Sequence, residues 1–302
     1  MTERPPPFSA LRAVEAASRH RSFTWAAKEL QITHSAVSQS IRRLEADLGT
    51  TLFERKGGAM EPSEAALRLA ESYFEAAQSL DRTLKEITGA PREGVLAVAM
   101  PADFGRLWFS GKLARLTEAV PDLRIEVRTL SAGAQDRQSD VEIEFASNEG
   151  RADDAVVSDV ASFPVCSPEF LGRKEISRPQ EVLRNPLISG GGLAWDGWAA
   201  HFQVAPKAPT HVFDDAAMAL DAAAQGAGVA LTHLFAAEGH LDAGRLVALP
   251  LEAPTGRSIR LSANTSPGKA DLVGRFSMWL RLEVGRSLAL HAARNPALAT
   301  RT

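Results

Sequence analysis

Cysteine is nearly absent from this sequence, since Cys166 is the only one among 302 residues. A single cysteine excludes an internal disulfide and any metal site built from several thiolates. Long apolar runs are missing too: the longest, Val95–Met100, is far shorter than the roughly 20 residues of a membrane-spanning helix. The N-terminal segment has no apolar signal-peptide core behind a basic start. We therefore expect a cytoplasmic protein that is neither exported nor inserted into a membrane.

The common catalytic motifs are also missing. There is no phosphate-binding P-loop, no His-Glu-x-x-His and no nucleophile elbow. The seven histidines are scattered, with none at metal-ligand spacing. The glycine-rich run Ser189–Gly192 lacks dinucleotide-binding spacing and is more typical of a flexible loop. We expect no enzymatic activity, no cofactor and no metal.

The composition is that of a globular protein, and its charge is unevenly distributed. With 45% hydrophobic and 24% charged residues, a chain of this length is expected to form two or three domains. Residues 1–60 carry nine lysines and arginines against six acids, a formal charge of +3, whereas the remaining residues carry 25 against 31, or −6. A basic N-terminal region on an acidic body indicates that this region alone contacts a polyanion.

Three helices are predicted in the basic region. Ser9 is a candidate cap for the first, and Thr24 begins the second, which runs to Leu30. Thr33 is placed to cap a third helix, His34–Leu48, and Gly49 to end it. The buried stripe of the third helix is expected to contain Ala36, Val37, Ile41, Leu44 and Leu48.

Two helices joined by so short a turn are typical of a helix-turn-helix, whose second helix enters the DNA major groove. Short polar side chains and Gln39 are suited to base edges, and arginines to phosphates. A plain helical hairpin with a solvated polar face fits the same pattern, and the pattern alone leaves both open. The candidate DNA-binding residues are Thr33, His34, Ser35, Ser38, Gln39, Arg42, Arg43, Arg55 and Lys56.

Four runs of this region form a dense pattern: Phe23–Leu30, Ile32–Ser38, Ile41–Gly49 and Leu52–Arg55. Together they resemble the N-terminal signature of LysR-type transcriptional regulators, and most closely the regulators of glycine cleavage and β-lactamase genes. The resemblance implies a winged helix-turn-helix, a dimerising linker helix and a periplasmic-binding-protein-like α/β effector domain with two subdomains. It favours DNA binding over the plain hairpin.

The sequence departs from the family pattern in the wing and the start of the linker. The wing lacks the usual second arginine, which Gly58 replaces, although Lys56 restores a charge. Pro62 and Ser63 replace the usual Leu-Thr pair, and Ala66 the closing glycine. We expect a changed wing contact with DNA rather than loss of binding.

A long helix is predicted to follow, from Ser63 to Ile87, with no proline or glycine inside it. Its apolar residues recur at three- and four-residue steps, as in a coiled-coil seam. A helix packed on its own domain is the alternative, but the resemblance favours dimerisation. The candidate dimerisation residues are Leu67, Phe74, Leu80 and Leu84.

Beyond this helix, strands and helices alternate, which predicts parallel sheets covered by helices. We expect a DNA-binding domain at 1–62, a linker helix at 63–90 and an effector domain at 91–302. Its first subdomain would comprise about 91–162 plus 265–290, and its second about 163–264.

Ligands of such folds bind in the cleft between subdomains, at strand ends and helix N-termini. The candidate effector-binding residues are Ala102, Asp103, Phe104, Ser131, Asp215, Thr232 and His233. Helix capping is the alternative role for the aspartates. If Glu142 and Glu144 also border the cleft without an arginine partner, a cationic or zwitterionic effector is favoured. If caps and Arg106 neutralise these acids, the cleft tolerates anions.

The sequence thus predicts a sequence-specific transcriptional regulator controlled by a small-molecule effector. Its partners would be double-stranded promoter DNA with an interrupted dyad, the effector, and further copies in a homodimer or homotetramer. A cytoplasmic solute-binding protein without a DNA-binding role is the alternative, which the basic N-terminal region argues against.

Overall fold

The computed structural model describes residues 6–56, 59–88, 94–130, 139–148, 156–172, 176–264 and 269–295. The chain divides into two compact units. The first contains residues 1–94 with 117–123 and 274–285, and the second contains 95–116, 124–273 and 286–302. In the described part of the chain, no helix is long and apolar enough to cross a membrane.

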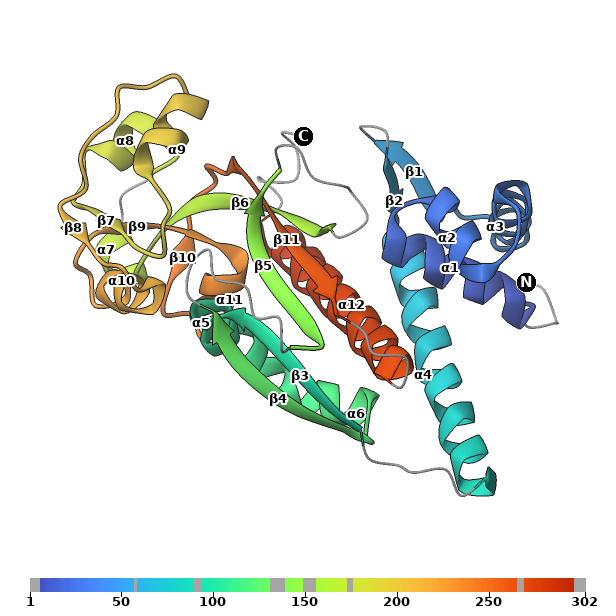
Figure 1. Cartoon of the computed structure of the whole chain (residues 1–302). Helices are drawn as coiled ribbons and strands as arrows, with labels where there is room; N and C mark the ends of the chain where they lie inside the picture. The colour runs from blue at the N-terminus through green and yellow to red at the C-terminus, as the bar shows by residue number, and fades with distance from the viewer. Residues whose placement is uncertain are drawn as a thin grey trace. The chain divides into compact units, whose positions relative to one another are not determined.

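The N-terminal part of the first unit is a three-helix domain followed by a hairpin and a long helix (Figure 1). In chain order the elements are α1 Phe8–His20, α2 Phe23–Leu30, α3 His34–Leu48, β1 Phe53–Lys56, β2 Ala59–Pro62 and α4 Glu64–Thr88. Small buried alanines, among them Ala13, Ala17, Ala26 and Ala27, let the helices approach closely. The antiparallel pairing of β1 with β2 forms the wing.

The third helix and its caps are confirmed. The Thr33 hydroxyl accepts a hydrogen bond from the Ala36 amide at 3.2 Å, and Gly49 ends the helix with a φ of 64°. The buried stripe is partly wrong: Val37, Ile41 and Leu44 are buried, but Leu48 is 42% exposed. Leu48 lies in the last turn, where the helix extends past the core.

The predicted starts of the first two helices are wrong, by two residues for the first and by one for the second. The first begins at Phe8 after Pro7, and no side chain caps it, so Ser9 lies inside the helix. The second begins at Phe23, because the Ser22 hydroxyl accepts from the Trp25 amide at 3.4 Å. Ser22 therefore caps this helix, and Thr24, which was predicted to begin it, is its second residue.

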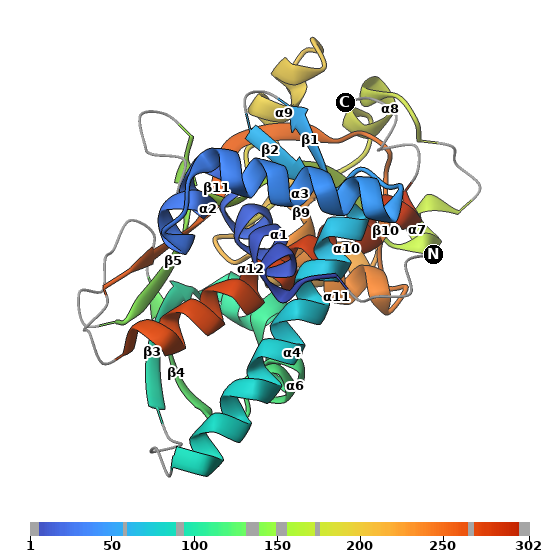
Figure 2. The ribbon, with the colours of Figure 1, turned by 90° about the vertical axis from the view of Figure 1, so that its right-hand side faces the viewer.

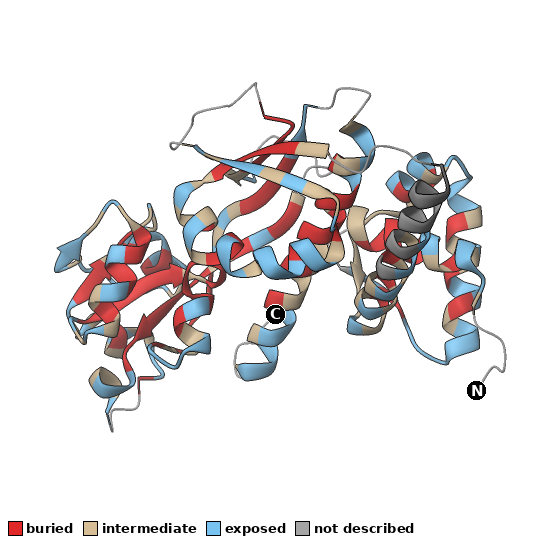
Figure 3. Cartoon of the chain, turned by 90° about the horizontal axis from the view of Figure 1, so that it is seen from below, coloured by how far each residue is buried: buried red, intermediate tan, exposed pale blue. Residues whose placement is uncertain are grey.

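The second unit is built on a twisted sheet with the strand order β4-β3-β5-β11-β6-β9-β7-β8, and β10 pairs with β6. Helices flank this sheet, and its buried strands appear in red in Figure 3. The strands are β3 Gly94–Pro101, β4 Leu123–Leu130, β5 Val141–Ser147, β6 Val156–Cys166, β7 Leu187–Ser189, β8 His211–Val212, β9 Val229–His233, β10 Val247–Ala248 and β11 Ala253–Ala263.

The helices of this half follow the strands. A helical segment runs from Ala102 to Ala119 and comprises α5 Ala102–Phe104, a π-helical turn Gly105–Phe109, a 3-10 turn Ser110–Lys112 and α6 Leu113–Ala119. The other helices are α7 Pro168–Leu171, α8 Pro179–Leu183, α9 Trp195–His201, α10 Ala216–Ala224, α11 Leu234–Asp242 and α12 Ala270–Arg294.

The expectation of purely parallel pairing is wrong. β3 pairs with β5, and β7 with both β8 and β9, in parallel, but β11 is antiparallel to both β5 and β6. The reason is that β6 and β11, eleven residues each, run through the middle of the sheet and join its two halves. Cys166, at the end of β6, is fully buried, as a small apolar residue would be.

Candidate nucleic-acid interface and effector cleft

The helix-turn-helix is built from a tight turn between two capped helices. Gln31 adopts a left-handed conformation with a φ of 56°, and the Ile32 amide donates to the Ala27 carbonyl at 3.0 Å. Thr33 then caps α3, and its hydroxyl also lies 2.9 Å from that of Ser35. This turn leaves one long face of α3 in solvent. Figure 2 shows that helix together with the β1–β2 hairpin.

Most of the predicted DNA-binding side chains lie on that solvent face. Thr33, His34, Ser35, Gln39, Arg42 and Arg43 are exposed, and Ser38 is half-buried. Arg55 is exposed on β1 of the wing, and the side chain of Lys56 lies outside the described residues. The buried face of the same helix packs Val37, Ile41 and Leu44 into the core. The helix is therefore amphipathic, with its polar side available to a ligand.

Glu45 joins α3 to the wing, a role that the sequence analysis did not find. Its Oε1 accepts hydrogen bonds from the Leu52 amide at 2.7 Å and the Phe53 amide at 3.2 Å. Ser63 holds the other side of this segment, because its amide donates to the Leu52 carbonyl at 2.8 Å. Glu45 therefore supplies the side-chain link from α3 to the start of the wing, and backbone bonds from Ser63 to Leu52 and from Met60 to Arg21 hold the rest of the hairpin.

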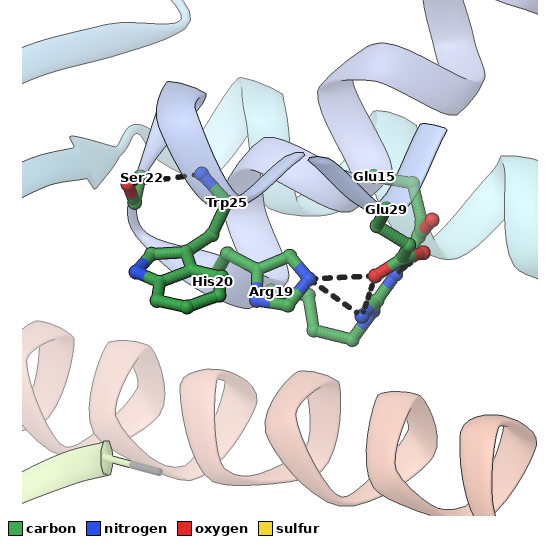
Figure 4. A network of polar contacts seen from close by, with 6 residues as sticks. All are labelled: Glu15, Arg19, His20, Ser22, Trp25 and Glu29. Atoms are coloured by element: carbon green, nitrogen blue, oxygen red, sulfur yellow. Dashed lines mark hydrogen bonds and ion pairs between the residues drawn. The ribbon is translucent and has the colours of Figure 1, made fainter. Parts of the chain in front are cut away.

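A second missed feature is a polar network between α1 and α2 (Figure 4). The Arg19 guanidinium bonds to Glu15 at 2.7 Å and to both carboxylate oxygens of Glu29, and His20 Nε2 lies 2.6 Å from Glu29. Burial alone would raise the pKa of Glu29, but the hydrogen bonds from His20 and Arg19 and the charge of Arg19 lower it to about 2. Arg19 therefore fixes the α1–α2 geometry and is not a free positive charge.

The candidate dimerisation residues on α4 differ in exposure. In the single chain Leu80 is 56% exposed, Leu67 is half-buried and Phe74 is 6% exposed. The side chain of Leu84 lies outside the described residues.

The effector-cleft candidates gather around the N-terminus of α10. Asp215 caps this helix, because its carboxylate accepts from the Met218 amide at 3.0 Å. The Asp103 carboxylate, which follows β3, accepts from the Ala216 amide at 3.3 Å. Burial, together with the charge of Asp215, raises the pKa of Asp103, whereas the amide of Met218 and the charge of Arg106 lower that of Asp215.

Arg106 neutralises part of this acidic group. Its Nη2 donates to the Asp215 carboxylate at 2.6 Å, so the hypothesis of cleft acids without an arginine partner is wrong. Glu144 stands opposite Arg260 in the β5–β11 ladder, and Glu142 is buried. The alternative in which a helix cap and Arg106 balance the acids fits the structure, and the argument for a cationic effector no longer holds.

A small cavity lies beside this cluster and is bordered by Thr232 and His233 at the end of β9, by Ala216 and by Gly190 and Gly191. Its volume of about 10 Å³ is close to the space that one water molecule needs. Burial and the charge of Arg257 lower the pKa of His233 to about 4, so the ring is neutral. Among the described residues, no group bonds to its Nδ1.

Two of the remaining cleft candidates, Ala102 and Phe104, flank Asp103 on α5. Phe104 is buried and its ring contacts those of Trp108, Phe145 and Phe235. Ala102 is exposed, and Ser131 lies outside the described residues.

The glycine-rich run has a packing role. A Cβ on Gly190 would lie 2.4 Å from that of Ala219, and one on Gly191, whose φ is 62°, would lie 2.8 Å from that of Ala216. These glycines therefore allow the loop to approach α10. The described residues contain no group of three or more histidines, cysteines or acids that could hold a metal ion.

Two family models match the chain. Residues 8–67 match the model described as bacterial regulatory helix-turn-helix protein, lysR family, and residues 89–281 match the LysR substrate binding domain. The chain is 31% identical over 289 residues to the HTH-type transcriptional regulator TrpI of Pseudomonas aeruginosa, covering 91% of this chain and 97% of that protein. It is 30% identical over 261 residues to the glycine cleavage system transcriptional activator of Escherichia coli, covering 82% and 83%.

The fold has solved counterparts. The structure of CrgA, a LysR-type transcriptional regulator from Neisseria meningitidis, matches with a TM-score of 0.60 at 19% identity, covering 95% of this chain and 99% of that chain.

Proposed function

Because this chain belongs to the LysR family of DNA-binding, non-enzymatic transcriptional regulators, which act in the cytoplasm, we propose that α3 supplies its base contacts and that the cleft at α10 binds its effector. The main support for the proposal is the exposed polar face of α3, a capped helix that directly follows the tight turn after α2. The N-terminal residues of such a helix face base edges, and residues farther along face phosphates.

The proposal divides the exposed residues into two groups. Thr33, His34, Ser35, Ser38 and Gln39 lie in the first two turns of α3, where short hydroxyls and an amide suit base edges. Positively charged side chains contact phosphates from the later turns and from the wing; these are Arg42, Arg43, Arg55 and Lys56.

Two copies are required to contact an interrupted dyad, because one recognition helix covers one half-site. We place the dimer seam on α4, at Leu67, Phe74, Leu80 and Leu84. Leu80, which is 56% exposed, and the half-buried Leu67 are accessible to a partner helix, whereas Phe74 is buried in the single chain. A pair of such dimers would form a tetramer.

The effector is proposed to bind where Asp103, Asp215, Thr232 and His233 meet. The Asp103–Ala216 and Arg106–Asp215 bonds hold the segment after β3 against the start of α10, and the adjoining cavity has room for about one water. An effector must therefore open these bonds, and it shifts the regulator only if it binds the opened arrangement better than the closed one.

DNA binding by two variants tests the division of roles. Gln39→Ala removes a base contact, and each good bidentate base contact contributes about 1–3 kcal/mol of discrimination, so the preference for the specific site should fall 5- to 150-fold. Arg43→Ala should weaken binding to specific and random duplexes alike and reduce the salt slope by about 1. Arg12→Ala, an exposed arginine on α1, is the matched control.

Binding constants for specific and random duplexes at several salt concentrations are the measurement. If both variants lost the same affinity on both duplexes, the assignment of base and phosphate contacts would be wrong. If neither variant differed from the Arg12 control, α3 would not be the recognition helix.

A further inference from the structure

A second cavity, of about 190 Å³, lies in the second unit and shares no lining residue with the effector cleft. It is open to solvent on one side and is lined by one face of α11, by β10 and by the last turns of α12. Its walls are mainly apolar, formed by Leu234, Leu241, Val247, Ala248 and Leu290. A cavity of about 150 Å³ with apolar walls holds a benzene ring, so this one has room for a ring and a small substituent.

The inner end of the cavity carries a buried carboxylate. Glu238 is 7% exposed, and it accepts a hydrogen bond from Lys112 Nζ at 2.6 Å and another from Ser287 Oγ at 2.8 Å. Two bonds leave part of the acceptor capacity of a carboxylate unused. Glu238 can therefore accept from a donor on a bound molecule without losing its partners.

His291 adds a second polar group to the lining. Its ring stacks on Phe163 at 4.8 Å, and its Nε2 is buried with no hydrogen-bond partner in the part of the chain that the structure describes. Burial lowers the pKa of His291, the charge of Glu238 opposes this and the charge of Arg294 adds to it, so the net effect disfavours the charged ring. An unpaired imidazole nitrogen in an apolar pocket is costly unless a ligand or water bonds to it.

The charges around the cavity are already paired. Glu238 is balanced by Lys112, and at the rim Arg294 forms an ion pair with Asp242. An anion would meet the Glu238 carboxylate, and a cation would meet no unbalanced acid. A charged ligand would lose hydration without gaining a counter-ion.

We propose that this cavity is a second binding site, separate from the effector cleft, for a small neutral molecule with a ring-sized apolar body and one hydroxyl or amide group. The apolar part packs against the leucines, and the polar group bonds to Glu238 or His291.

The site is connected to the effector cleft by a short chain of contacts. Ser287 Oγ, which donates to Glu238, also accepts from Trp108 Nε1 at 3.0 Å. The Trp108 ring stacks on Phe104 at 4.9 Å, and Phe104 directly follows Asp103, which bonds to the start of α10. A ligand that bonds to Glu238 alters the hydrogen bond between Ser287 and Glu238. Because Trp108 donates to the same Ser287 hydroxyl, the surroundings of the Trp108 indole change as well.

Calorimetry on the full-length protein with three probes of one size tests the site: benzyl alcohol, benzoate and benzylamine. Benzyl alcohol should bind one site with a dissociation constant of about 1 mM or tighter, and the two charged probes at least about tenfold more weakly. Leu290→Trp fills the cavity from a position that is 47% exposed and tolerates a larger side chain, and it should weaken benzyl alcohol at least about tenfold. Ala289→Trp, the exposed neighbour outside the lining, should not.

The Trp108 indole N–H signal in NMR spectra of the wild type is a second measurement that needs no cavity variant. It should move on addition of benzyl alcohol in proportion to occupancy. Absence of saturable binding, equal binding of all three probes, or an unmoved Trp108 signal at saturation would overturn the proposal. Both measurements are made without DNA, so a negative result would count against the second binding site and not against the proposed DNA contacts.

Discussion

Removing the Glu45 carboxylate should detach the wing from α3 while leaving α3 itself intact. In Glu45→Ala the Leu52 and Phe53 amides lose their shared acceptor, and both residues are buried, at 0% and 7% exposure. A buried donor left unpaired costs about 1–3 kcal/mol, so the two together cost about 2–6 kcal/mol. Glu45→Gln keeps an acceptor oxygen and loses only the charge assistance, a cost of about 1 kcal/mol.

Amide hydrogen exchange at Leu52 and Phe53 measures this effect locally, without a global unfolding model for a chain of several domains. Each 1.4 kcal/mol lost from the free energy of local opening speeds amide exchange tenfold. Exchange of these two amides should therefore accelerate at least about 30-fold in Glu45→Ala and about fivefold in Glu45→Gln. Asp47→Ala, which removes an exposed acid from the same helix, should change it less than about twofold.

Glu45→Ala should also change DNA binding. Because Arg55 lies on β1, a detached wing should weaken binding to specific and random DNA together. Unchanged exchange in Glu45→Ala, or equal effects of the alanine and glutamine variants, would refute the reasoning.

Four further changes test other parts of the structure. Leu80→Asp should shift the sedimenting mass toward monomer because it would bury a carboxylate in the proposed seam, whereas Arg68→Asp, at an exposed position on another face of the helix, should not; an unchanged oligomer would place the interface elsewhere. Because the pKa of Glu29 is lowered to about 2, its stabilising contribution is complete above about pH 4.3 and is lost as the pH falls toward 2; acid titration of Glu29→Gln should show a flatter dependence. Arg106→Ala should speed exchange of the Ala216 amide by opening the cleft, and unchanged exchange would show that Asp103 alone holds it. Gly228→Ala should destabilise the chain by at least about 2 kcal/mol in urea unfolding, since its φ is 152° and a Cβ would lie 2.4 Å from the Pro186 carbonyl oxygen; full stability would refute that geometry.

The helix-turn-helix could be predicted from the sequence because its determinants are local. Thr33 caps the helix that starts at the next residue, and Gly49 ends it within one turn, so each signal lies beside the structure it determines. The solvent face of α3 follows from the 3.6-residue period once Val37, Ile41 and Leu44 face the core. The errors at Ser9, Thr24 and Leu48 are end effects, where adjacent residues compete for one role.

The effector half depended on contacts between distant residues, which no local pattern encodes. Arg106 and Asp215 are 109 positions apart, and Asp103 and Ala216 are 113 apart, so only the folded sheet brings them together. The sequence alone determined the bounds of α3, its caps and the family. The tertiary structure decided that Arg106 balances Asp215, that Glu45 holds the wing, and that α11 and α12 enclose a second cavity, because these depend on which long-range pairs the sheet places side by side.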